Sequence, residues 1–412
     1  MGGPSGFGAI RRALSHREFA LYTGFSIPSL VGTWIQRVAV GWLMWELTGS
    51  GAWLGLLAFA DFFPVIVFSM FAGVIADRFE RVWVAIVTQA GQMVCSILLL
   101  VLAVTGSATP EWLVAITALQ GTASAFHQPV RQAIVARIVP RADLAAAIGI
   151  NSAAWHGSRF VGPAIAGLMI VAWGVAPAFA VNAFSYLGFL WALTRLTRMP
   201  PTPRRRTLGA IPAEIVEGWR YAVGHPGIAP AFVILTVGSV FARPVAELLP
   251  GFAADVFGRG ADGLALLTSA GGLGAMIGGL WLAQRGRVDG LTALVVASLI
   301  GVAGALVAFT ATAILWLALP AIALIGFGLT VSGSAIQTLV QNAVEDSVQG
   351  RVLGIYGFLW LGGPAVGSLV MGVASEWVGL RLPVFAGAIV CALAWIWAVG
   401  RTKAMARELE GD

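Results

Sequence analysis

Long apolar segments follow one another along this chain with little between them. Each is about as long as a helix that crosses a bilayer, which needs ~20 residues. Short turns rich in glycine, proline or charge separate the segments, which lack the alternating polarity of membrane β-strands. The pattern predicts an all-α membrane protein with twelve transmembrane helices, at residues 19–46, 52–75, 83–105, 111–135, 144–172, 176–197, 228–255, 262–283, 290–311, 314–340, 352–375 and 382–400.

The composition supports the same class of protein. Hydrophobic residues make up 58% of the chain and charged residues 11%, whereas an average soluble domain is about a quarter charged. The basic residues lie in short clusters between apolar segments rather than on one exposed face, so no nucleic-acid partner is expected. Cys95 and Cys391 lie in separate apolar segments, which predicts neither a disulfide nor a metal site.

Sequence motifs of catalysis and nucleotide binding do not occur here. The chain contains no G-x-S-x-G, no H-E-x-x-H and no Walker G-x-x-x-x-G-K-[ST] pattern. We therefore expect neither enzyme activity nor a cofactor. A pump without a nucleotide site would have to draw on an ion gradient.

The arginines set the predicted orientation in the membrane. When both termini are placed in the cytoplasm, most basic residues lie on or near the cytoplasmic side. The exceptions are Arg259 and Arg381, which fall outside, and Arg37, Arg159 and Arg243, which fall within helices. The positive-inside rule favours this distribution. The sequence thus predicts a multi-pass protein of the cell inner membrane with both termini cytoplasmic.

The longest connection separates two sets of six predicted helices. It divides the chain into an N-terminal bundle (1–198), a cytoplasmic linker (199–227) and a C-terminal bundle (228–412). The linker's pattern predicts an amphipathic helix in the lipid headgroup layer, which would be a passive tether or a regulatory element. One predicted face carries Ile211, Ile215, Trp219 and Ala222, and the other carries Glu214, Glu217 and Arg220.

The two predicted bundles share an internal repeat. One register pairs Arg37 with Arg243, Gly73 with Gly279 and Arg81 with Arg287. A second pair of similar segments is "VGPAIAGLM" at 161–169 and "GGPAVGSLVMG" at 362–372. Parallel six-helix repeats of this kind are a recurring architecture of secondary transporters. The repeat predicts two pseudo-symmetric bundles.

A charged motif closes the second predicted helix. The segment "GVIADRFER", residues 73–81, resembles the loop signature G-x-x-x-D-R-x-G-R of the major facilitator superfamily. The resemblance implies a conformational latch made of Gly73, Asp77, Arg78 and Arg81. Glu80 replaces the second glycine of the signature, and we expect this change to loosen the turn. Without the glycine spacing, an Asp-Arg pair in a loop would be ordinary surface charge.

Small residues on the fifth predicted helix form another pattern. Gly149, Ser158, Gly162, Pro163 and Gly167 resemble the fifth-helix motif of antiporters in the same superfamily. Small residues allow helices to pack closely and to bend, which favours rocking between two states. The alternative is ordinary small-residue packing, which a chain of this composition would supply in any case.

Longer stretches sharpen the resemblance. Residues 32–50, 62–81, 126–155 and 337–358 are similar to the branch often labelled transmembrane secretion effectors, which contains a bacterial enterobactin exporter. The resemblance implies a monomeric, proton-driven inner-membrane antiporter that exports siderophores or drug-like amphiphiles. A multidrug efflux pump and a lysophospholipid flippase of the same fold are the alternatives. The expected partners are a small molecule, protons and the lipid bilayer.

Ionisable residues deep in the predicted helices are candidate functional groups, because such groups are costly in lipid. Arg37 and Asp61 lie twelve residues before and after Gly49 in the first turn. Both therefore lie roughly 18 Å from that turn, at the same depth. We predict an ion pair between them, which is either a static lock or a proton switch at Asp61. His156 and Arg159 also lie deep, and Arg159 is expected to brace a neighbouring helix.

The superfamily resemblance implies that helices 1, 4, 7 and 10 line a central cavity. Arg37 and Arg243 would face it from equivalent positions and favour an anionic substrate group. The predicted cavity residues are Trp34, Arg37, Arg243, Glu247, Gln337 and Gln341. The predicted proton-coupling residues are Asp61, Arg37, Glu247 and His127, although His127 is also compatible with a hydrogen-bonded packing histidine.

Overall fold

The computed structural model describes the backbone of residues 7–199 and 211–411. The side chains of residues 7, 69–78, 211–215 and 346–347 are not among those described, so the side chains of the predicted latch residues Gly73, Asp77 and Arg78 lie outside the described residues. The described residues are helical and contain no strand. Two compact units are present: Met1–Leu47 with Phe63–Arg205 (unit 1), and Thr48–Phe62 with Arg206–Asp412 (unit 2).

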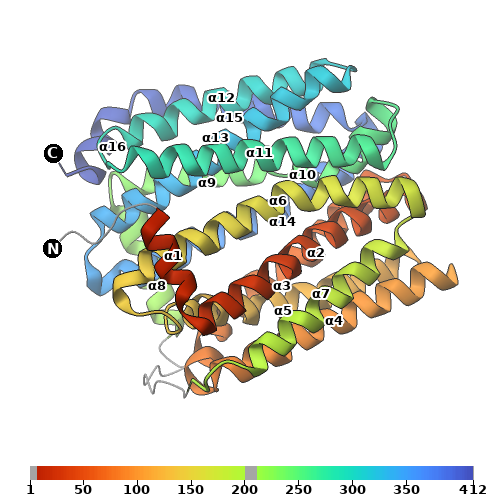
Figure 1. The fold of residues 1–412 in the computed structure, drawn as a ribbon. Coiled ribbons are helices and arrows are strands. Elements are labelled where there is room, and N and C mark those ends of the chain that lie inside the picture. The colour runs from red at the N-terminus through yellow and green to blue at the C-terminus, as the bar shows by residue number, and fades with distance from the viewer. Residues whose placement is uncertain (1–6, 200–210, 412) are drawn as a thin grey trace. The chain divides into compact units, whose positions relative to one another are not determined.

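Unit 1 contains the helices coloured red to yellow-green in Figure 1. They are α1 (Phe7–Ser15), α2 (Arg17–Thr48), the later part of α3 (Gly51–Arg78), α4 (Arg81–Thr105), α5 (Pro110–Val135), the short η1 (Arg141–Asp143), α6 (Leu144–Trp173) and α7 (Ala176–Thr194).

Unit 2 contains the start of α3 and all helices after residue 206. The latter are α8 (Ile211–Gly224), α9 (Ile228–Val237), η3 (Gly238–Ala242), α10 (Val245–Gly251), η4 (Phe252–Val256), α11 (Ala261–Arg285), α12 (Leu291–Ala311), α13 (Leu315–Ala343), α14 (Asp346–Val378), α15 (Arg381–Val399) and α16 (Thr402–Leu409).

Every predicted apolar segment coincides with a long helix, or, for residues 228–255, with the continuous run from α9 to η4. Nine helices of the described part are long and apolar enough to cross a membrane: α3, α4, α7, the α9–η4 run and α11 to α15. Helices α2, α5 and α6 are also long, with 32, 26 and 30 residues, and each carries polar or charged side chains among its apolar ones. These three helices hold the deep charges of unit 1.

A buried polar network holds the helices of unit 1 together. The Gln36 carbonyl oxygen on α2 accepts hydrogen bonds from Ser96 on α4 (2.6 Å) and Asn182 on α7 (2.8 Å). The Gln36 amide donates to Gln120 on α5 (2.8 Å). Such bonds satisfy polar groups that would be costly inside a membrane. The network fixes the rotation of α2 about its axis.

Small residues let the helices of unit 2 approach each other closely. A Cβ atom at Gly274 on α11 would overlap the carbonyl of Ala323 on α13, and one at Gly326 on α13 would overlap the carbonyl of Gly271. On α14, Gly363 and Gly367 contact η3 in the same way. Close backbone contact of this kind is the usual means of helix association in membranes.

The first turns of α3 pack against α14 within unit 2. The Glu376 carboxylate accepts hydrogen bonds from the Ser50 hydroxyl (2.7 Å) and the Ala52 N–H (2.9 Å) at the start of α3. Gly55 leaves no room for a side chain beside Ser368. The division between the units therefore differs from the predicted bundle boundary, because Thr48–Phe62 groups with unit 2.

Two π turns interrupt the run from α9 to η4. In η3 the Arg243 N–H donates to the Gly238 carbonyl (3.0 Å), and in η4 the Phe257 N–H donates to the Phe252 carbonyl (3.0 Å). π turns are rare and often lie at functional sites. The first of them immediately precedes Arg243, a predicted cavity residue.

The sequence expectation for Glu80 was wrong. Glu80 is the N-cap of α4, with an extended backbone (φ −63°) that does not require glycine. Its carboxylate accepts hydrogen bonds from the N–H groups of Val82 (3.0 Å), Trp83 (2.6 Å) and Met199 (2.9 Å). Glu80 therefore secures this turn rather than loosening it, because it satisfies orphan donors at a helix start.

The predicted linker helix is present as α8, and its placement in the lipid headgroup layer stays a prediction. Gly218 and Ala222 are buried, and Gly218 packs on Arg351 of α14. Glu217 forms an ion pair with the same arginine (2.8 Å). Trp219, predicted on the apolar face with Ala222, is exposed. Contact with α14 thus covers the side of α8 that carries Gly218 and Ala222.

The N-terminal helix α1 is tied to unit 1 through Asp143, and Figure 1 shows α1 beside α6. The buried Asp143 carboxylate accepts hydrogen bonds from Arg12 Nε (3.0 Å) and His16 Nε2 (2.9 Å). Hydrogen bonds from His16 and Arg12 hold the pKa of Asp143 below its usual value. The aspartate is therefore ionised at neutral pH and holds α1 in place.

Candidate substrate and coupling site

A partly buried tryptophan in unit 1 is flanked by two arginines. The guanidinium carbons of Arg37 and Arg159 lie 5.8 Å and 5.6 Å from the ring centre of Trp34. Both distances are within the range of a cation–π interaction. Arg37 and Trp34 come from α2 and Arg159 from α6. The predicted brace, Arg159, therefore belongs to the same cluster as two predicted cavity residues.

The local fold explains why these side chains meet. Successive residues of a helix are rotated by about 100°, so Trp34 and Arg37 lie about 60° apart on the side of α2 away from Gln36. The network around Gln36 turns that side toward α6. There Gly162 permits the approach, since a Cβ at this position would lie 2.5 Å from the Trp34 Cβ.

A second tryptophan extends the cluster toward the end of α5. The Trp155 and Trp34 rings meet edge to face, with centres 6.1 Å apart. The Arg131 guanidinium lies 5.4 Å from the Trp155 ring centre and donates a hydrogen bond to the Asn151 side-chain oxygen (2.7 Å). We call the alternating series Arg37, Trp34, Arg159, Trp155 and Arg131 the arginine–tryptophan ladder.

Four members of the antiporter-like motif are buried on α6: Ser158, Gly162, Pro163 and Gly167. Gly149, the fifth, is exposed, and a Cβ there would meet nothing within 4 Å. Gly162 thus has a specific packing role against α2, whereas the structure gives no close contact that requires glycine at position 149.

His127 is buried on α5, four residues before Arg131 of the ladder. Its Nδ1 lies 3.0 Å from the Thr88 hydroxyl on α4, and its ring meets Phe189 of α7 edge to face. These contacts favour the packing interpretation. The proton-carrying role of His127 stays a prediction.

Unit 2 carries a related arrangement around Trp360. The Arg243 guanidinium lies 4.3 Å from the Trp360 ring centre, and its Nη1 donates to the Trp360 carbonyl (2.5 Å). Tyr356 stacks on Trp360 at 6.2 Å and donates a hydrogen bond to the Gly333 carbonyl (3.2 Å). Gly333 in turn leaves room for the indole.

The two clusters correspond through the internal repeat. The register that pairs Gly162 with Gly363 also pairs Trp155 with Tyr356 and Arg159 with Trp360. In each unit an arginine on the first helix of the repeat thus contacts an aromatic side chain. In unit 1 the aromatic residue, Trp34, is on the same helix as Arg37, and in unit 2 the aromatic residue, Trp360, is on the fifth helix of the repeat. The arrangement can hold a negatively charged group beside a flat ring.

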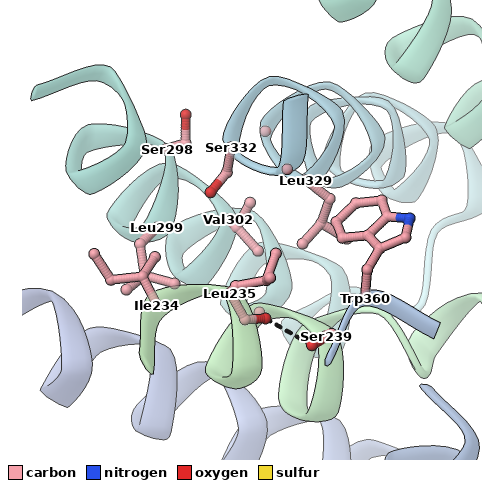
Figure 2. A pocket seen from close by; sticks show the side chains of 12 residues that line it. Ile234, Leu235, Ser239, Ser298, Leu299, Val302, Leu329, Ser332 and Trp360 are labelled. Atoms are coloured by element: carbon pink, nitrogen blue, oxygen red, sulfur yellow. Dashed lines mark hydrogen bonds between the residues drawn. The ribbon is translucent and has the colours of Figure 1, made fainter. Parts of the chain in front are cut away.

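A small cavity opens beside Trp360, among α9, η3, α12 and α13, as Figure 2 shows. Its volume of about 10 Å³ is enough for roughly one water molecule. Ser239, Ser298 and Ser332 line it, and the Ser239 hydroxyl donates to the Leu235 carbonyl (2.6 Å). In this conformation the cavity is too small for a substrate.

The remaining predicted site residues are placed as follows. Arg37 belongs to unit 1 and Asp61 to unit 2, and their pairing stays a prediction. Glu247 is partly buried in the first turn of α10. Gln337 and Gln341 are exposed on α13. Arg81 is buried at the start of α4, where its N–H donates to the Met199 carbonyl (3.4 Å).

Sequence reasoning missed Arg131, Trp155 and Trp360. Arg131 lies near the end of an apolar segment, where an arginine is usually a cytoplasmic anchor. A signal was present for Trp155, because it precedes Arg159 by four residues and such residues share a helix face. The contact between Arg131 and Trp155 joins different helices, and no local spacing indicates it.

Deep cation–aromatic clusters in a helical membrane protein mark a candidate functional site, and the comparisons with known proteins place the chain among transporters rather than enzymes. The chain belongs to the transmembrane secretion effector family of the major facilitator superfamily, whose model matches residues 12–408. This confirms the branch indicated by the sequence motifs.

Individual relatives cover most of the chain. It is 24% identical to the staphyloferrin A transporter of Staphylococcus aureus, over 85% of this chain and 87% of that protein. It is 22% identical to macrolide efflux protein A of Streptococcus pyogenes, over 88% and 90%. It is 26% identical to the enterobactin exporter of Shigella boydii, over 82% and 76%.

The fold is similar to solved transporter structures. A bacterial homolog of the human lysosomal transporter Spinster, in an inward-facing and unoccupied conformation, aligns with a TM-score of 0.70. The alignment covers 98% of this chain and 99% of that one at 16% sequence identity, a level at which the likeness concerns the fold alone.

Proposed function

We propose that this protein is a proton-coupled secondary active exporter of small amphiphilic anions that works by alternating access. Its family supports transport, and its similarity to a staphyloferrin A transporter and an enterobactin exporter supports siderophore-like substrates. The observation that carries the anionic preference is the arginine–aromatic pair in each unit: Arg37 with Trp34, and Arg243 with Trp360. Guanidinium groups bind carboxylates and phosphates, and indoles stack on rings.

In this proposal the chain crosses the inner membrane twelve times as a monomer, with both termini in the cytoplasm. Helices α2, α5 and α6 complete the set of spanning helices, because each exceeds the ~20 residues that a crossing requires. Residues 1–198 and 228–412 act as the two bundles and 199–227 as their linker.

Proton coupling is assigned to Asp61, with Glu247 as the second candidate. An intramembrane carboxylate that alternates between ionised and neutral forms can exchange protons for substrate. Arg37 would favour the ionised form of Asp61 when the two are close. Gly73, Asp77, Arg78 and Arg81 act as the latch that biases one conformation.

The deciding experiment measures flux in proteoliposomes that contain the purified protein and an imposed pH gradient. Anionic siderophores, lipophilic cations and lysophospholipids are compared at equal concentration. Uphill movement of the anions, abolished by a protonophore, is the expected result. Movement of cations alone would assign a multidrug efflux pump, and movement of lysophospholipid alone would assign a flippase.

Variants at the carboxylates test the coupling. Asp61→Asn should abolish uphill transport and retain substrate exchange, because the amide imitates a carboxyl that is always protonated. If Arg37 and Asp61 are only a static lock, Asp61→Asn should instead lower the melting temperature and Arg37→Gln/Asp61→Asn should restore it. A stable and fully coupled Asp61→Asn protein would exclude both roles and move attention to Glu247 and His127.

A further inference from the structure

A buried arginine that forms no ion pair with any described carboxylate lies at one end of the arginine–tryptophan ladder. Arg131 is 6% exposed, and among the described residues no carboxylate forms an ion pair with it. Its contacts are the Asn151 oxygen (2.7 Å) and the Trp155 ring (5.4 Å). A neutral amide and an indole lower the cost of the charge but do not neutralise it. Buried charges are ordinarily paired.

A second unsatisfied group lies beside this arginine. The Tyr22 side chain of α2 is 2% exposed and adjoins Arg131. Its hydroxyl is buried, and apart from the Arg131 guanidinium beside it no hydrogen-bond partner lies among the described residues. Buried polar groups in native proteins nearly always have a partner, which is often a ligand, an ion or a water molecule. A donor hydroxyl and a guanidinium side by side are both suited to an anion.

We propose that Arg131, Tyr22 and Asn151, together with Trp155, form a binding site for an anionic group carried on an aromatic ring. The guanidinium and the phenol would donate to the anion, and the ring would stack on the half-buried indole. Arg131 lies four residues before the last residue of α5, near the end of that helix. The proposed cavity arginine, Arg37, lies near the middle of α2.

The site deepens the proposed function, on which its role in transport rests. Under the proposed orientation the α5 end of the ladder is the cytoplasmic one. An anionic substrate would meet Arg131 and Trp155 first and then pass Arg159 and Trp34 on its way to Arg37. At each step the substrate would leave one arginine and tryptophan pair and bind the next pair of the ladder.

Three naphthalene probes of different charge test the site: 2-naphthoate, neutral 2-naphthol and 2-naphthylmethylammonium. Equilibrium dialysis against the full-length protein in phosphatidylcholine nanodiscs gives each affinity. We expect wild-type protein to prefer 2-naphthoate. Arg131→Gln should weaken 2-naphthoate binding by about tenfold or more, because hydrogen bonds to charged groups are the strong ones, and should leave 2-naphthol within about twofold.

Tyr22→Phe provides a variant that does not threaten folding. The hydroxyl has no partner other than Arg131 among the described residues, so its removal should change the melting temperature little. It should nevertheless weaken 2-naphthoate binding and spare 2-naphthol. Arg195→Gln is the matched control, because Arg195 also lies 5.4 Å from a tryptophan ring, that of Trp191, but at the exposed end of α7.

Several outcomes would overturn the site. Equal weakening of all three probes in Arg131→Gln would make the arginine a structural brace, and an unchanged anion preference in Tyr22→Phe and Arg131→Gln would place the anion elsewhere. Loss of 2-naphthoate binding when phosphatidylglycerol is added would mean that a lipid headgroup fills the site. Charge-selective binding without gradient-driven flux would support the binding site and refute the proposed exporter function. Gradient-driven flux with unaltered 2-naphthoate binding in both variants would support the exporter function and refute the binding site.

Discussion

Gly162 on α6 lies directly against Trp34 on α2, so that a Cβ at position 162 would come 2.5 Å from the Cβ of the tryptophan and 3.1 Å from the Val31 carbonyl oxygen. Neither neighbour is the flexible end of a side chain. We expect Gly162→Ala to destabilise the protein by about 1–3 kcal/mol, the usual cost of overpacking, and to impair transport because Trp34 moves from Arg159. Melting temperature and flux measure both effects. Gly149→Ala is the control, since space is open there, and equal damage from both changes would contradict the packing role.

Arg243 should not be replaceable by lysine. The guanidinium both stacks on Trp360 and donates to its carbonyl, and an ammonium group cannot reproduce the flat stacking. We expect Arg243→Lys to raise the KM for an anionic substrate about tenfold, in line with the size of a desolvated cation–π contact.

Arg401→Lys serves as the comparison for this change. Arg401 stacks on Trp397 at 4.2 Å, but at the exposed end of α15. Its replacement should leave KM unaltered. A normal KM in Arg243→Lys would show that charge alone suffices at position 243.

Glu80 should stabilise unit 1 despite its departure from the superfamily signature. Replacing it with glycine would restore the signature but remove the hydrogen bonds to Val82, Trp83 and Met199. We expect Glu80→Gly to cost about 1 kcal/mol, as the loss of an N-cap does, whereas Glu80→Gln retains an acceptor and much of the stability. Thermal unfolding of the purified variants checks the expected order of stability, in which wild type is most stable and Glu80→Gly least stable. A Glu80→Gly protein more stable than wild type would show that glycine is the better residue at this turn.

The contact of α1 with unit 1 should resist mild acid. Because hydrogen bonds from His16 and Arg12 lower the pKa of Asp143 in the folded protein, its stabilising effect is complete above the unfolded value of about 3.9 and is lost as pH falls through the lower folded value. The protection factors of the α1 amides, which are corrected for the pH dependence of intrinsic exchange, should therefore be equal at pH 7 and pH 5. Asp143→Asn should lower the protection factors at both, and a lower protection factor in wild-type protein at pH 5 would contradict the assignment.

Local patterns in the sequence were enough to locate the helices. Apolar runs of the right length survive any tertiary arrangement, because a bilayer requires backbone hydrogen bonds to close within each segment. Gly162 was recognised by its resemblance to the antiporter motif, and Arg37 by its depth in an apolar segment. The internal repeat paired Arg37 with Arg243, which lies in the run from α9 to η4.

Contacts between distant segments could not be found in this way. Arg131 resembles a flanking anchor until α6 brings Trp155 and Asn151 to it. Glu80 breaks a signature, and only the return of the chain at Met199 reveals what its carboxylate binds. In both cases the deciding partner lies more than twenty residues away or on another helix, where periodicity carries no information.

The π turn that precedes Arg243 has a consequence for how that residue is aimed. In an α-helix the N–H of Arg243 would bond four residues back, but it bonds five back, to Gly238. The turn thus holds one residue more than a regular helix would, and each residue adds about 100° of rotation. Deleting a single residue of η3 would straighten the hydrogen-bond ladder and swing the guanidinium away from Trp360. The reach of this arginine is therefore encoded in the length of the preceding turn as much as in its own side chain.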